Sequence, residues 1–385
     1  MSTVEKLIKE LCPDGVSYVA IGDIADCFAG ATPSTQRVEY WTNGTIPWMS
    51  SGEVNKKLIT QTDKLITQEA FDSCSTRMIP KDSVVIALAG QGKTRGLVAR
   101  TRIELCTNQS LCSLVPKGPV SSDFLYYYLS SQYVQLRSAS SGDGTRGGLN
   151  LQIIKSYLVP APPVEVQHEI VQILESFSQL EAELEAELEA RKKQYEFYRN
   201  QLLTFPKQGG VRWVPMGEVV TVARPPKVIS RNDYQEIGNY PIIDQGQTRI
   251  AGWTSDSESL LPVAEYVLFG DHTRTTKFVD HEFAQGADGL QILKAKDGIL
   301  PKFLFYTLQN LEIPNRGYNR HWSIVKPMKV PVPTIESQQE IIDILDKFYA
   351  LVTDISSGLP AELNARRKQY EYYRDKLLAF KELGE

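Results

Sequence analysis

The sequence has few of the residues that build disulfide frameworks, metal sites or membrane spans. Its five cysteines form no Cys-x-x-Cys pair, which argues against a disulfide scaffold and against a structural zinc site. No apolar run reaches the roughly 18 residues that a membrane-spanning helix needs. The N-terminal segment carries charges where a signal peptide needs an apolar stretch, so we expect a cytoplasmic protein.

Positive charge is also scarce. The chain holds 42 lysine and arginine residues against 46 aspartate and glutamate residues, a net charge of −4, whereas nucleic-acid-binding domains are usually basic. Two local segments depart from this average. The segment 316–329 contains basic residues and no acidic ones, and a second basic run consists of Lys93, Arg95, Arg100 and Arg102.

Recognisable catalytic motifs are missing as well. The sequence contains no Gly-x-Ser-x-Gly nucleophile elbow, no zinc-protease helix motif, no nuclease carboxylate cluster and no amino-methyltransferase motif. The four histidines are dispersed, and only His272 and His281 share a segment with nearby aspartates. These absences favour a binding protein over an enzyme, with no metal or cofactor of its own.

The most informative feature that is present is an internal repeat. The segment 190–205, ARKKQYEFYRNQLLTF, matches 365–380, ARRKQYEYYRDKLLAF, at eleven of sixteen positions. Upstream, QHEIVQILESF from Gln167 matches QQEIIDILDKF from Gln338 at six of eleven positions, and a Pro-x-Pro sequence precedes both copies. The chain therefore consists of two related halves.

Both repeated segments are expected to be long amphipathic helices, because their apolar residues recur at steps of three and four. The seam residues are Ile170, Phe177, Leu184, Tyr195, Tyr198, Leu202, Ile341, Phe348, Tyr370, Tyr373 and Leu377. Two interpretations are open: a coiled coil that dimerises the chain, or a spacer between two domains of one chain. We favour the spacer, because each helix follows its own domain.

The two helices are expected to differ in continuity. The first contains LEAELEAELEA, a tract of strong helix formers from Leu180 to Ala190. The second copy has SSGLPAEL at this place, where Gly358 and Pro360 indicate a helix stop and a new start. We expect a break near 358–360.

The globular parts repeat more loosely. FLYYYL from Phe124 resembles FLFYTL from Phe303, and the offset that aligns them places Thr94-Arg95 on Thr273-Arg274. Both Thr-Arg pairs follow a short apolar strand, SVVIAL or EYVLF. Either the match of two residues is a coincidence, or the two pairs share one task in two divergent domains.

The Gly-Lys-Thr sequence before Arg95 resembles the end of a phosphate-binding P-loop, but the loop's first glycine is replaced by Ala87. A glycine-containing loop with lysine and arginine suits DNA phosphates and base edges equally well. In the second half, FGDHTRTTK and NRGYNRHW combine arginine, lysine, histidine, asparagine and aromatic residues on predicted surface loops. Alternatively, Tyr318 and Trp322 are ordinary half-buried aromatics beside solvated charges.

Two divergent domains alternating with two similar helices that end in QYExYRxxLLxF resemble the specificity subunits of type I restriction-modification systems. The recognition domains of that family have openings and loops similar to segments of this chain. In the first half the similar segment is TPSTQRVEYWTNGTIPWMSSGEV. In the second half the similar segments are YPIIDQGQTRIAGWT, GDHTRTTK and GYNRHW. The resemblance implies two α/β (α+β) target-recognition domains and two long antiparallel coiled-coil helices in a pseudo-twofold repeat. The expected parts are 1–163 and 207–334 for the domains, and 164–206 and 335–385 for the helices.

The resemblance also implies a function. Each domain would read one half of a bipartite, asymmetric double-stranded DNA target, and the helices would set the spacer between the halves. Two modification subunits with AdoMet and two restriction subunits with ATP and Mg²⁺ would supply adenine methylation and cleavage. The DNA-binding candidates are Thr32, Ser34, Ser50, Ser51, Gln91, Lys93, Thr94, Arg95, Arg146, Asn150, Gln247, Thr248, Arg249, His272, Thr273, Arg274, Lys277, Arg316, Tyr318, Asn319, Arg320 and His321.

Two alternatives from other classes remain. The first is a coiled-coil scaffold that links two protein-binding domains without DNA specificity. The second is a methyltransferase or nuclease in its own right, which would show activity as an isolated chain. A salt series of duplex binding separates DNA recognition from scaffolding, because phosphate contacts make binding steeply dependent on salt.

Overall fold

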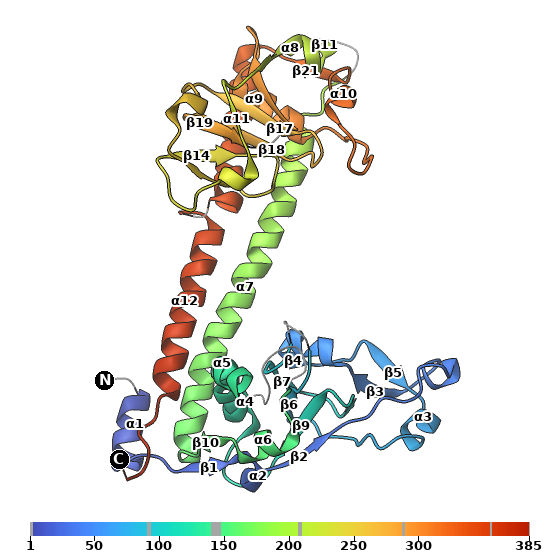
Figure 1. Ribbon diagram of the computed structural model, residues 1–385, viewed down its shortest axis with the longest axis vertical. Helices are drawn as coiled ribbons and strands as arrows, with labels where there is room; N and C mark the ends of the chain where they lie inside the picture. The colour runs from blue at the N-terminus through green and yellow to red at the C-terminus, as the bar shows by residue number, and fades with distance from the viewer. Residues whose placement is uncertain are drawn as a thin grey trace. The chain divides into compact units, whose positions relative to one another are not determined.

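The computed structural model describes residues 3–90, 94–139, 148–206, 210–286, 289–354 and 356–384. The chain forms two compact units, one made of Met1–Glu183 with Asn364–Glu385 and one made of Leu184–Leu363 (Figure 1). The units divide within the long helices. They therefore do not test the domain–helix boundaries that the sequence predicts.

The domain of the first unit is built on two mixed sheets and a short strand pair. One sheet has the order β2-β9-β6-β7-β4, a second has the order β5-β3-β8, and β1 pairs with β10. The strands are β1 (Tyr18–Ala20), β2 (Ala25–Ala29), β3 (Ile46–Met49), β4 (Leu58–Ile59), β5 (Lys64–Ile66), β6 (Val84–Ala87), β7 (Val98–Thr101), β8 (Cys106–Thr107), β9 (Leu111–Pro116) and β10 (Leu158–Pro160).

Short helices connect or precede these strands, and one long helix leaves the domain (Figure 1). The α-helices are α1 (Thr3–Leu11), α2 (Ile21–Ile24), α3 (Gln68–Asp72), α4 (Ser122–Ser131), α5 (Tyr133–Ser138), α6 (Leu151–Ser156) and α7 (Val164–Leu202). Two 3-10 helices, η1 (Val38–Tyr40) and η2 (Ser51–Lys56), lie in the segment around β3.

The second unit repeats this plan. Its sheets have the orders β12-β20-β17-β18 and β13-β19-β14-β15, β16 pairs with β19, and β11 pairs with β21. The strands are β11 (Arg212–Pro215), β12 (Val220–Ala223), β13 (Val228–Ile229), β14 (Tyr240–Ile243), β15 (Gly252–Thr254), β16 (Leu260–Leu261), β17 (Tyr266–Gly270), β18 (Thr276–Val279), β19 (Phe283–Gly286), β20 (Leu290–Ala295) and β21 (Lys329–Val332). The helices are α8 (Met216–Val219), η3 (Arg231–Asp233), η4 (Ser257–Ser259), α9 (Pro301–Gln309), α10 (Trp322–Val325), α11 (Ile335–Thr353) and α12 (Leu359–Leu378).

The correspondence between the two domains extends to strand direction. β2, β9, β6 and β7 pair antiparallel in that order, as do β12, β20, β17 and β18. β3 runs parallel to β8 and antiparallel to β5, and β14 has the same relation to β19 and β15. The internal repeat expected from the sequence is therefore confirmed at the level of topology. The matching segments FLYYYL and FLFYTL form the equivalent helices α4 and α9.

The central apolar strands are buried on both faces. In β6, Val84 and Ile86 join the core that contains α4, whereas Val85 and Ala87 join a second core on the other face of the sheet. β17 divides its side chains between two cores in the same way. A strand with two buried faces is apolar at every position, which explains the continuous runs SVVIAL and EYVLF.

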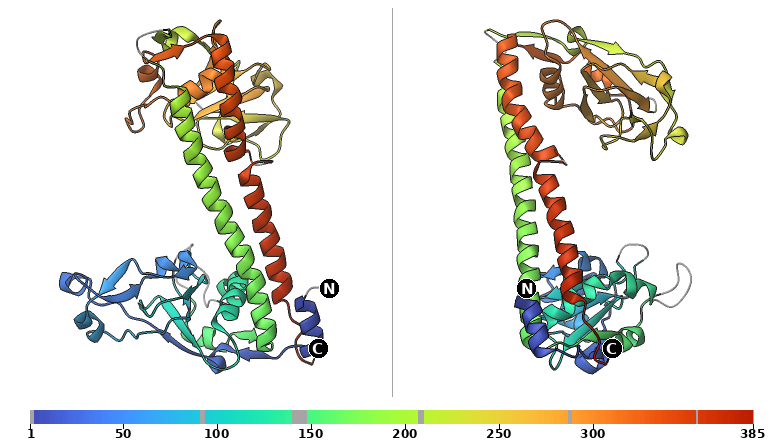
Figure 2. Two further views of the ribbon diagram at one scale, coloured as in Figure 1. Left: turned by 180° about the vertical axis from the view of Figure 1, so that it is seen from behind. Right: turned by 90° about the vertical axis from the view of Figure 1, so that its left-hand side faces the viewer.

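The long helices pack in antiparallel pairs within each unit. In the first unit, Phe177 of α7 stacks on Tyr373 of α12 with 5.5 Å between ring centroids. In the second unit, Tyr198 of α7 stacks on Phe348 of α11 at 5.3 Å, and Figure 2 shows these helices side by side. Among the described residues, no helix is long and apolar enough to cross a membrane.

The expected break in the second helix is confirmed. α11 ends at Thr353 and α12 begins at Leu359. The Gly358 N–H donates a hydrogen bond to the Asp354 carbonyl at 3.0 Å. A Cβ atom at Gly358 would lie 2.7 Å from the Ala350 carbonyl oxygen, so the turn requires glycine at this position.

Candidate nucleic-acid interface

The two Thr-Arg pairs lie on equivalent hairpins. Thr94 and Arg95 precede β7 on the β6–β7 connection, and Thr273 and Arg274 precede β18 on the β17–β18 connection. The chain after Arg95 forms a strand, whereas a P-loop leads into a helix, so the structure does not support a nucleotide-binding loop here. Arg274 has a φ of 62°, a left-handed conformation that is uncommon for a residue other than glycine.

A buried carboxylate anchors the loop that faces the second hairpin. Asp271 is 2% exposed, and its Oδ1 accepts a hydrogen bond from the Trp322 N–H at 2.6 Å. Its Oδ2 accepts one from Gln291 Nε2 at 3.3 Å. Asp271 therefore ties the hairpin to the start of α10 and fixes the position of the intervening loop 311–321.

His321 completes this anchor. Its backbone N–H and its Nδ1 lie 2.9 Å and 2.8 Å from the Asp271 carbonyl oxygen, and its Nε2 lies 3.2 Å from the Arg316 N–H. The carbonyl can only accept and the amide can only donate, so the proton is on Nδ1. We expected His321 to contact DNA; this expectation is wrong, because the side chain is fully buried and both ring nitrogens are bonded within the protein.

The anchored loop presents an exposed aromatic side chain. Tyr318 is 81% exposed, and its ring stacks on His272 with 4.4 Å between centroids and 9° between planes. His272 Nδ1 lies 3.1 Å from the Tyr318 carbonyl oxygen, so this nitrogen donates and Nε2 can accept a further hydrogen bond. Tyr318 is therefore an exposed aromatic residue whose ring is held by stacking on His272, and not a half-buried core residue.

Other candidates of the second unit are also exposed. Arg316, Asn319 and Arg320 are exposed on the same loop, and the Asn319 amide donates to the Arg316 carbonyl at 2.6 Å. Gln247, Thr248 and Arg249 are exposed after β14, and Thr273 and Arg274 are exposed on the hairpin.

Lys277 does not belong to this exposed set. Its side chain is 10% exposed, and its Nζ donates to the carbonyl oxygens of Asp244 at 2.8 Å and Thr248 at 2.6 Å. Burial lowers the pKa of Lys277, although the nearby Asp244 carboxylate opposes this shift. The expectation that Lys277 contacts DNA is wrong, because this lysine instead connects the segment after β14 to β18.

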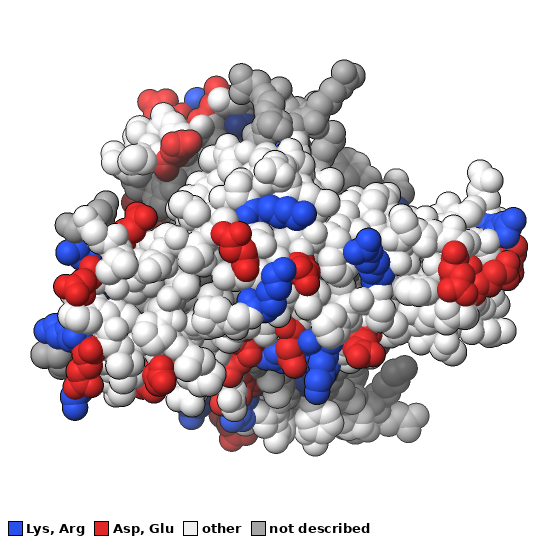
Figure 3. Space-filling view, turned by 90° about the horizontal axis from the view of Figure 1, so that it is seen from below, with Lys and Arg blue, Asp and Glu red and all other residues white. Residues whose placement is uncertain are grey.

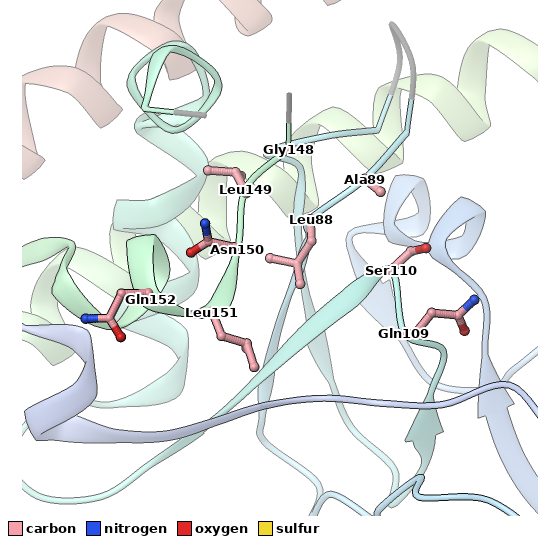
Figure 4. A pocket seen from close by; sticks show the side chains of 9 residues that line it. All are labelled: Leu88, Ala89, Gln109, Ser110, Gly148, Leu149, Asn150, Leu151 and Gln152. Carbon is pink, nitrogen blue, oxygen red and sulfur yellow. The ribbon is translucent and has the colours of Figure 1, made fainter. Parts of the chain in front are cut away.

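The first unit has a shallow hollow of about 590 Å³ beside its hairpin (Figure 4). Gln109, Ser110 and Gln152 supply polar side chains to its wall, together with Asn150. The Asn150 Oδ1 accepts from the Ile153 N–H at 2.9 Å and so caps α6. The full lining is Leu88, Ala89, Gln109, Ser110, Gly148, Leu149, Asn150, Leu151 and Gln152.

The other first-unit candidates do not line this hollow. Thr32 donates a hydrogen bond to Gln109, Ser34 is exposed, and Ser51 begins η2. The Ser50 N–H and hydroxyl both donate to the buried Glu53 carboxylate, at 2.8 Å and 3.1 Å, so Ser50 is engaged in local structure. Gln91, Lys93 and Arg146 lie outside the described residues.

The second basic run does not form one patch. Arg100 is 11% exposed and pairs with Asp123 at 2.6 Å and Glu175 at 2.8 Å, and Arg102 pairs with Asp82 at 2.8 Å. On the face shown in Figure 3, basic and acidic side chains are interspersed, and no continuous area of one sign crosses it. The ion pair between Arg100 and Glu175 attaches the domain to α7 and is not available to DNA.

Most seam residues pack within the chain. Ile170, Tyr195 and Ile341 are buried, Leu184, Leu202 and Leu377 are partly buried, and Phe177 also contacts Tyr370 at 6.5 Å between centroids. Burial raises the pKa of Tyr195 to about 12, and its hydroxyl donates to Gln309 at 2.8 Å. These contacts leave little of the seam for another chain.

Sequence reasoning missed Asp271 and Gln245, which organise the second site. Gln245 accepts hydrogen bonds from the His272 N–H at 3.2 Å and the Thr273 hydroxyl at 2.6 Å. Both lie next to expected candidates, but their partners are far away in the chain, so local sequence carried no signal. Among the described residues, no group of three or more histidine, cysteine, aspartate or glutamate residues could hold a metal ion.

Comparison with known proteins identifies the family. The family model described as "Type I restriction modification DNA specificity domain" matches residues 13–190 and 210–365, one match in each half of the chain. The chain belongs to this family. The two matches coincide with the two halves that share strand order.

Curated relatives agree with the assignment. The chain is 28% identical to the type I restriction enzyme EcoprrI specificity subunit of Escherichia coli over 391 residues, which cover 92% of each protein. It is 31% identical to the EcoR124I/EcoR124II specificity subunit of the same species over 198 residues. That match spans 50% of this chain and about half, 49%, of the relative.

Solved structures share the fold. The type I restriction-modification S subunit from M. genitalium superimposes with a TM-score of 0.60 at 16% identity, covering 94% of this chain and 96% of that one. A structure of a type I restriction-modification system gives the same score at 19% identity, covering 95% and 98%. The predicted fold class is therefore confirmed.

Proposed function

We propose that this chain reads a bipartite, asymmetric DNA target, with one half-site for each domain. The observation that carries this proposal is that two domains of one topology present different exposed groups. The second presents the Tyr318–His272 stack with arginines and Asn319, and the first presents a hollow with glutamines and Asn150. Two domains that share one topology but expose different side chains can each recognise a different half-site.

The exposed groups match the chemistry of DNA recognition. Arginine can bind guanine O6 and N7 bidentately, and asparagine or glutamine can bind adenine N6 and N7 in the same way. Arg316, Arg320 and Asn319 offer these groups on a loop that Asp271 and His321 hold in place. A preorganised loop loses less conformational entropy on binding, which favours selective contacts.

The proposal places the chemistry in partner subunits. Two modification subunits would dock on the helices and carry AdoMet, and two restriction subunits would use ATP and Mg²⁺, so the isolated chain is expected to be a non-catalytic subunit. The names of the relatives support this assignment, because they describe specificity subunits of restriction enzymes. The cytoplasmic location expected from the sequence stays a prediction.

A duplex-binding series in increasing salt tests the proposal. We expect a steep decrease of affinity with salt, because phosphate contacts release counterions. A scaffold for proteins would show no such slope and no preference among duplexes. With modification partners added, Arg95→Ala and Arg274→Ala should weaken different half-sites, and wild-type affinity in both variants would remove these arginines from the interface.

A further inference from the structure

A hollow of about 250 Å³ in the second unit has two arginines in its wall. Arg199 reaches it from the last turn of α7, and Arg274 reaches it from the β17–β18 hairpin. The other lining residues are Thr276, Leu308, Gln309, Leu311 and Ile313. Within the described residues no carboxylate lines the hollow, so two positive charges face one concave site without an acidic partner.

Both guanidinium groups are held in place. Arg274 Nη1 donates to the Ile313 carbonyl at 3.1 Å. The Arg199 guanidinium lies 5.3 Å from the centre of the Tyr195 ring, and its Nε is enclosed with no hydrogen-bond acceptor among the described residues. Neither arginine makes an ion pair with any carboxylate that the structure describes. Because this Nε is enclosed, an occupant of the hollow with acceptor oxygens would be bound through the outer nitrogens of the two guanidinium groups.

The internal repeat provides a comparison within the same chain. Arg374 occupies the position of Arg199 in the second copy of the tail, and the next residue there is Asp375. Asp375 Oδ1 lies 2.8 Å from Arg374 Nε and 2.7 Å from its Nη2. The first copy has Asn200 at this place. One neutral residue therefore leaves Arg199 without the counter-charge that its equivalent has.

We propose that Arg199 and Arg274 bind an oxyanion, and that this oxyanion is a phosphate of the DNA backbone. Guanidinium groups recognise phosphate through paired N–H donors, and two of them converge here from a helix and a hairpin. A phosphate contact positions a protein on DNA and carries no sequence information. The contact would therefore fix the second recognition hairpin on the duplex. The choice of DNA as the source rests on the proposed function.

Inorganic phosphate is the first probe, because it tests the site without DNA. The full-length chain, labelled with ¹⁵N in arginine, is titrated with phosphate, and the Nε–H signal of Arg199 is assigned through Arg199→Lys. We expect this signal to shift in the wild type. Asn200→Asp supplies the neighbouring carboxylate found in the second copy, and it should abolish the shift while keeping both arginines. The matched control is Asp375→Asn, which should leave the Arg199 shift unchanged.

A mixed-sequence 30-base-pair duplex is the second probe. Loss of one phosphate contact should decrease the slope of log affinity against log salt by about 0.9. We expect this decrease in Asn200→Asp and in Arg274→Asn, whose asparagine tolerates the left-handed backbone, and not in Asp375→Asn.

The outcomes separate the two claims. The oxyanion site is overturned if phosphate does not shift the Arg199 Nε–H signal of the wild type, or if it shifts the signal of Asn200→Asp by the same amount. DNA is overturned as the source of the oxyanion if the wild-type signal shifts but all variants have the same salt slope. A wild-type chain whose signal shifts but which binds no duplex supports the oxyanion site and contradicts the proposed function.

Discussion

Gln167 and Gln338, at the same position of the internal repeat, make the same hydrogen bonds in the two units. Gln167 is fully buried, and its Oε1 accepts from the Ser121 N–H at 2.8 Å. Its amide nitrogen donates to the carbonyl oxygens of Pro119 and Pro162, each at 2.8 Å. One side chain thus joins the start of α7 to the segment that precedes α4.

Gln338 makes the equivalent contacts at the start of α11. Its Oε1 accepts from the Leu300 N–H at 2.8 Å, and its amide donates to Gly298 and Pro333 at 2.9 Å and 3.0 Å. Eight residues further along each helix, Glu175 and Asp346 also bind their domains, through Arg100 and Lys302. Each domain is therefore attached to its helix by a buried amide and an ion pair.

The buried amide can be tested by substitution. Gln167→Met should lower the free energy of unfolding by about 1–3 kcal/mol, because it leaves one N–H and two carbonyls without partners. Hydrogen exchange should then increase in the first unit only, and Gln338→Met should have the reciprocal effect. Gln172→Met, at an exposed position of the same helix, is the control. Equal exchange in both units would contradict a local attachment.

Helix length should determine the DNA spacer. Insertion of one Ala-Glu-Leu-Glu unit within the Leu180–Ala190 tract adds about 6 Å of helix. We expect the spacer of the recognised target to change by about one or two base pairs, with both half-sites retained. Methylome sequencing measures the motif directly, and Ala186→Gln controls for composition at constant length. An unchanged spacer would refute the helix as its determinant.

Tyr318 should contribute to DNA affinity through its ring. Tyr318→Ala removes the aromatic surface that rests on His272, and we expect duplex affinity to decrease about 10-fold, as for the loss of one stacking contact. Tyr318→Phe keeps the ring and should bind like the wild type. If Phe and Ala variants lose affinity equally, the hydroxyl and not stacking is responsible.

Two exposed aromatics at equivalent repeat positions are expected to contact the modification subunits. Phe197 and Tyr372 are 62% and 63% exposed, and each makes an edge contact with the next residue, Tyr198 or Tyr373, at 5.5 Å or 5.4 Å between centroids. Exposed aromatics are typical interface anchors. Phe197→Ser and Tyr372→Ser should each reduce the bound modification subunits from two to one, measured by native mass spectrometry. Glu196→Ser should have no effect.

Three of the cysteines should react slowly with alkylating reagents near neutral pH, and their reactivity should increase as the pH is raised. Burial raises the pKa of Cys27 and Cys106 to about 11, and it raises the pKa of Cys112 as well. A raised thiol pKa favours the protonated form, so the reactive thiolate is scarce below about pH 10 in the folded chain. Alkylation by iodoacetamide at pH 8, followed by mass spectrometry, should be slow at these sites. Guanidinium should restore ordinary rates; equal rates in folded and unfolded chains would contradict the burial.

The sequence was sufficient for the features that depend on local pattern. Helix α7, the break at Gly358 and the two apolar hairpin strands follow from periodicity, glycine and proline placement, and continuous apolar runs. The alignment of the repeat paired Gln167 with Gln338, but it did not indicate that either amide is buried, because both segments also contain polar residues that are exposed.

The site required tertiary structure, because burial depends on partners that are distant in the chain. In their local sequence, His321 and Lys277 resemble surface residues that contact DNA. In the structure their side chains are largely buried and hydrogen-bonded to the carbonyl oxygens of Asp271 and Asp244. Arg100 similarly belongs to a basic run in sequence and to an ion pair with Glu175 in space. Only the distinction between exposed and buried cations separates the candidates for DNA contact from structural residues.

The division of the units within the helices has a genetic consequence. The second unit is one continuous stretch, Leu184–Leu363, and the two tail copies lie near its ends. Crossovers in the gene regions that encode these tails would exchange a recognition domain as one cassette, without dividing a sheet. The incoming domain would meet tail residues such as Tyr195 that have identical counterparts in the other copy, so new specificities can arise by recombination of parts that already fit.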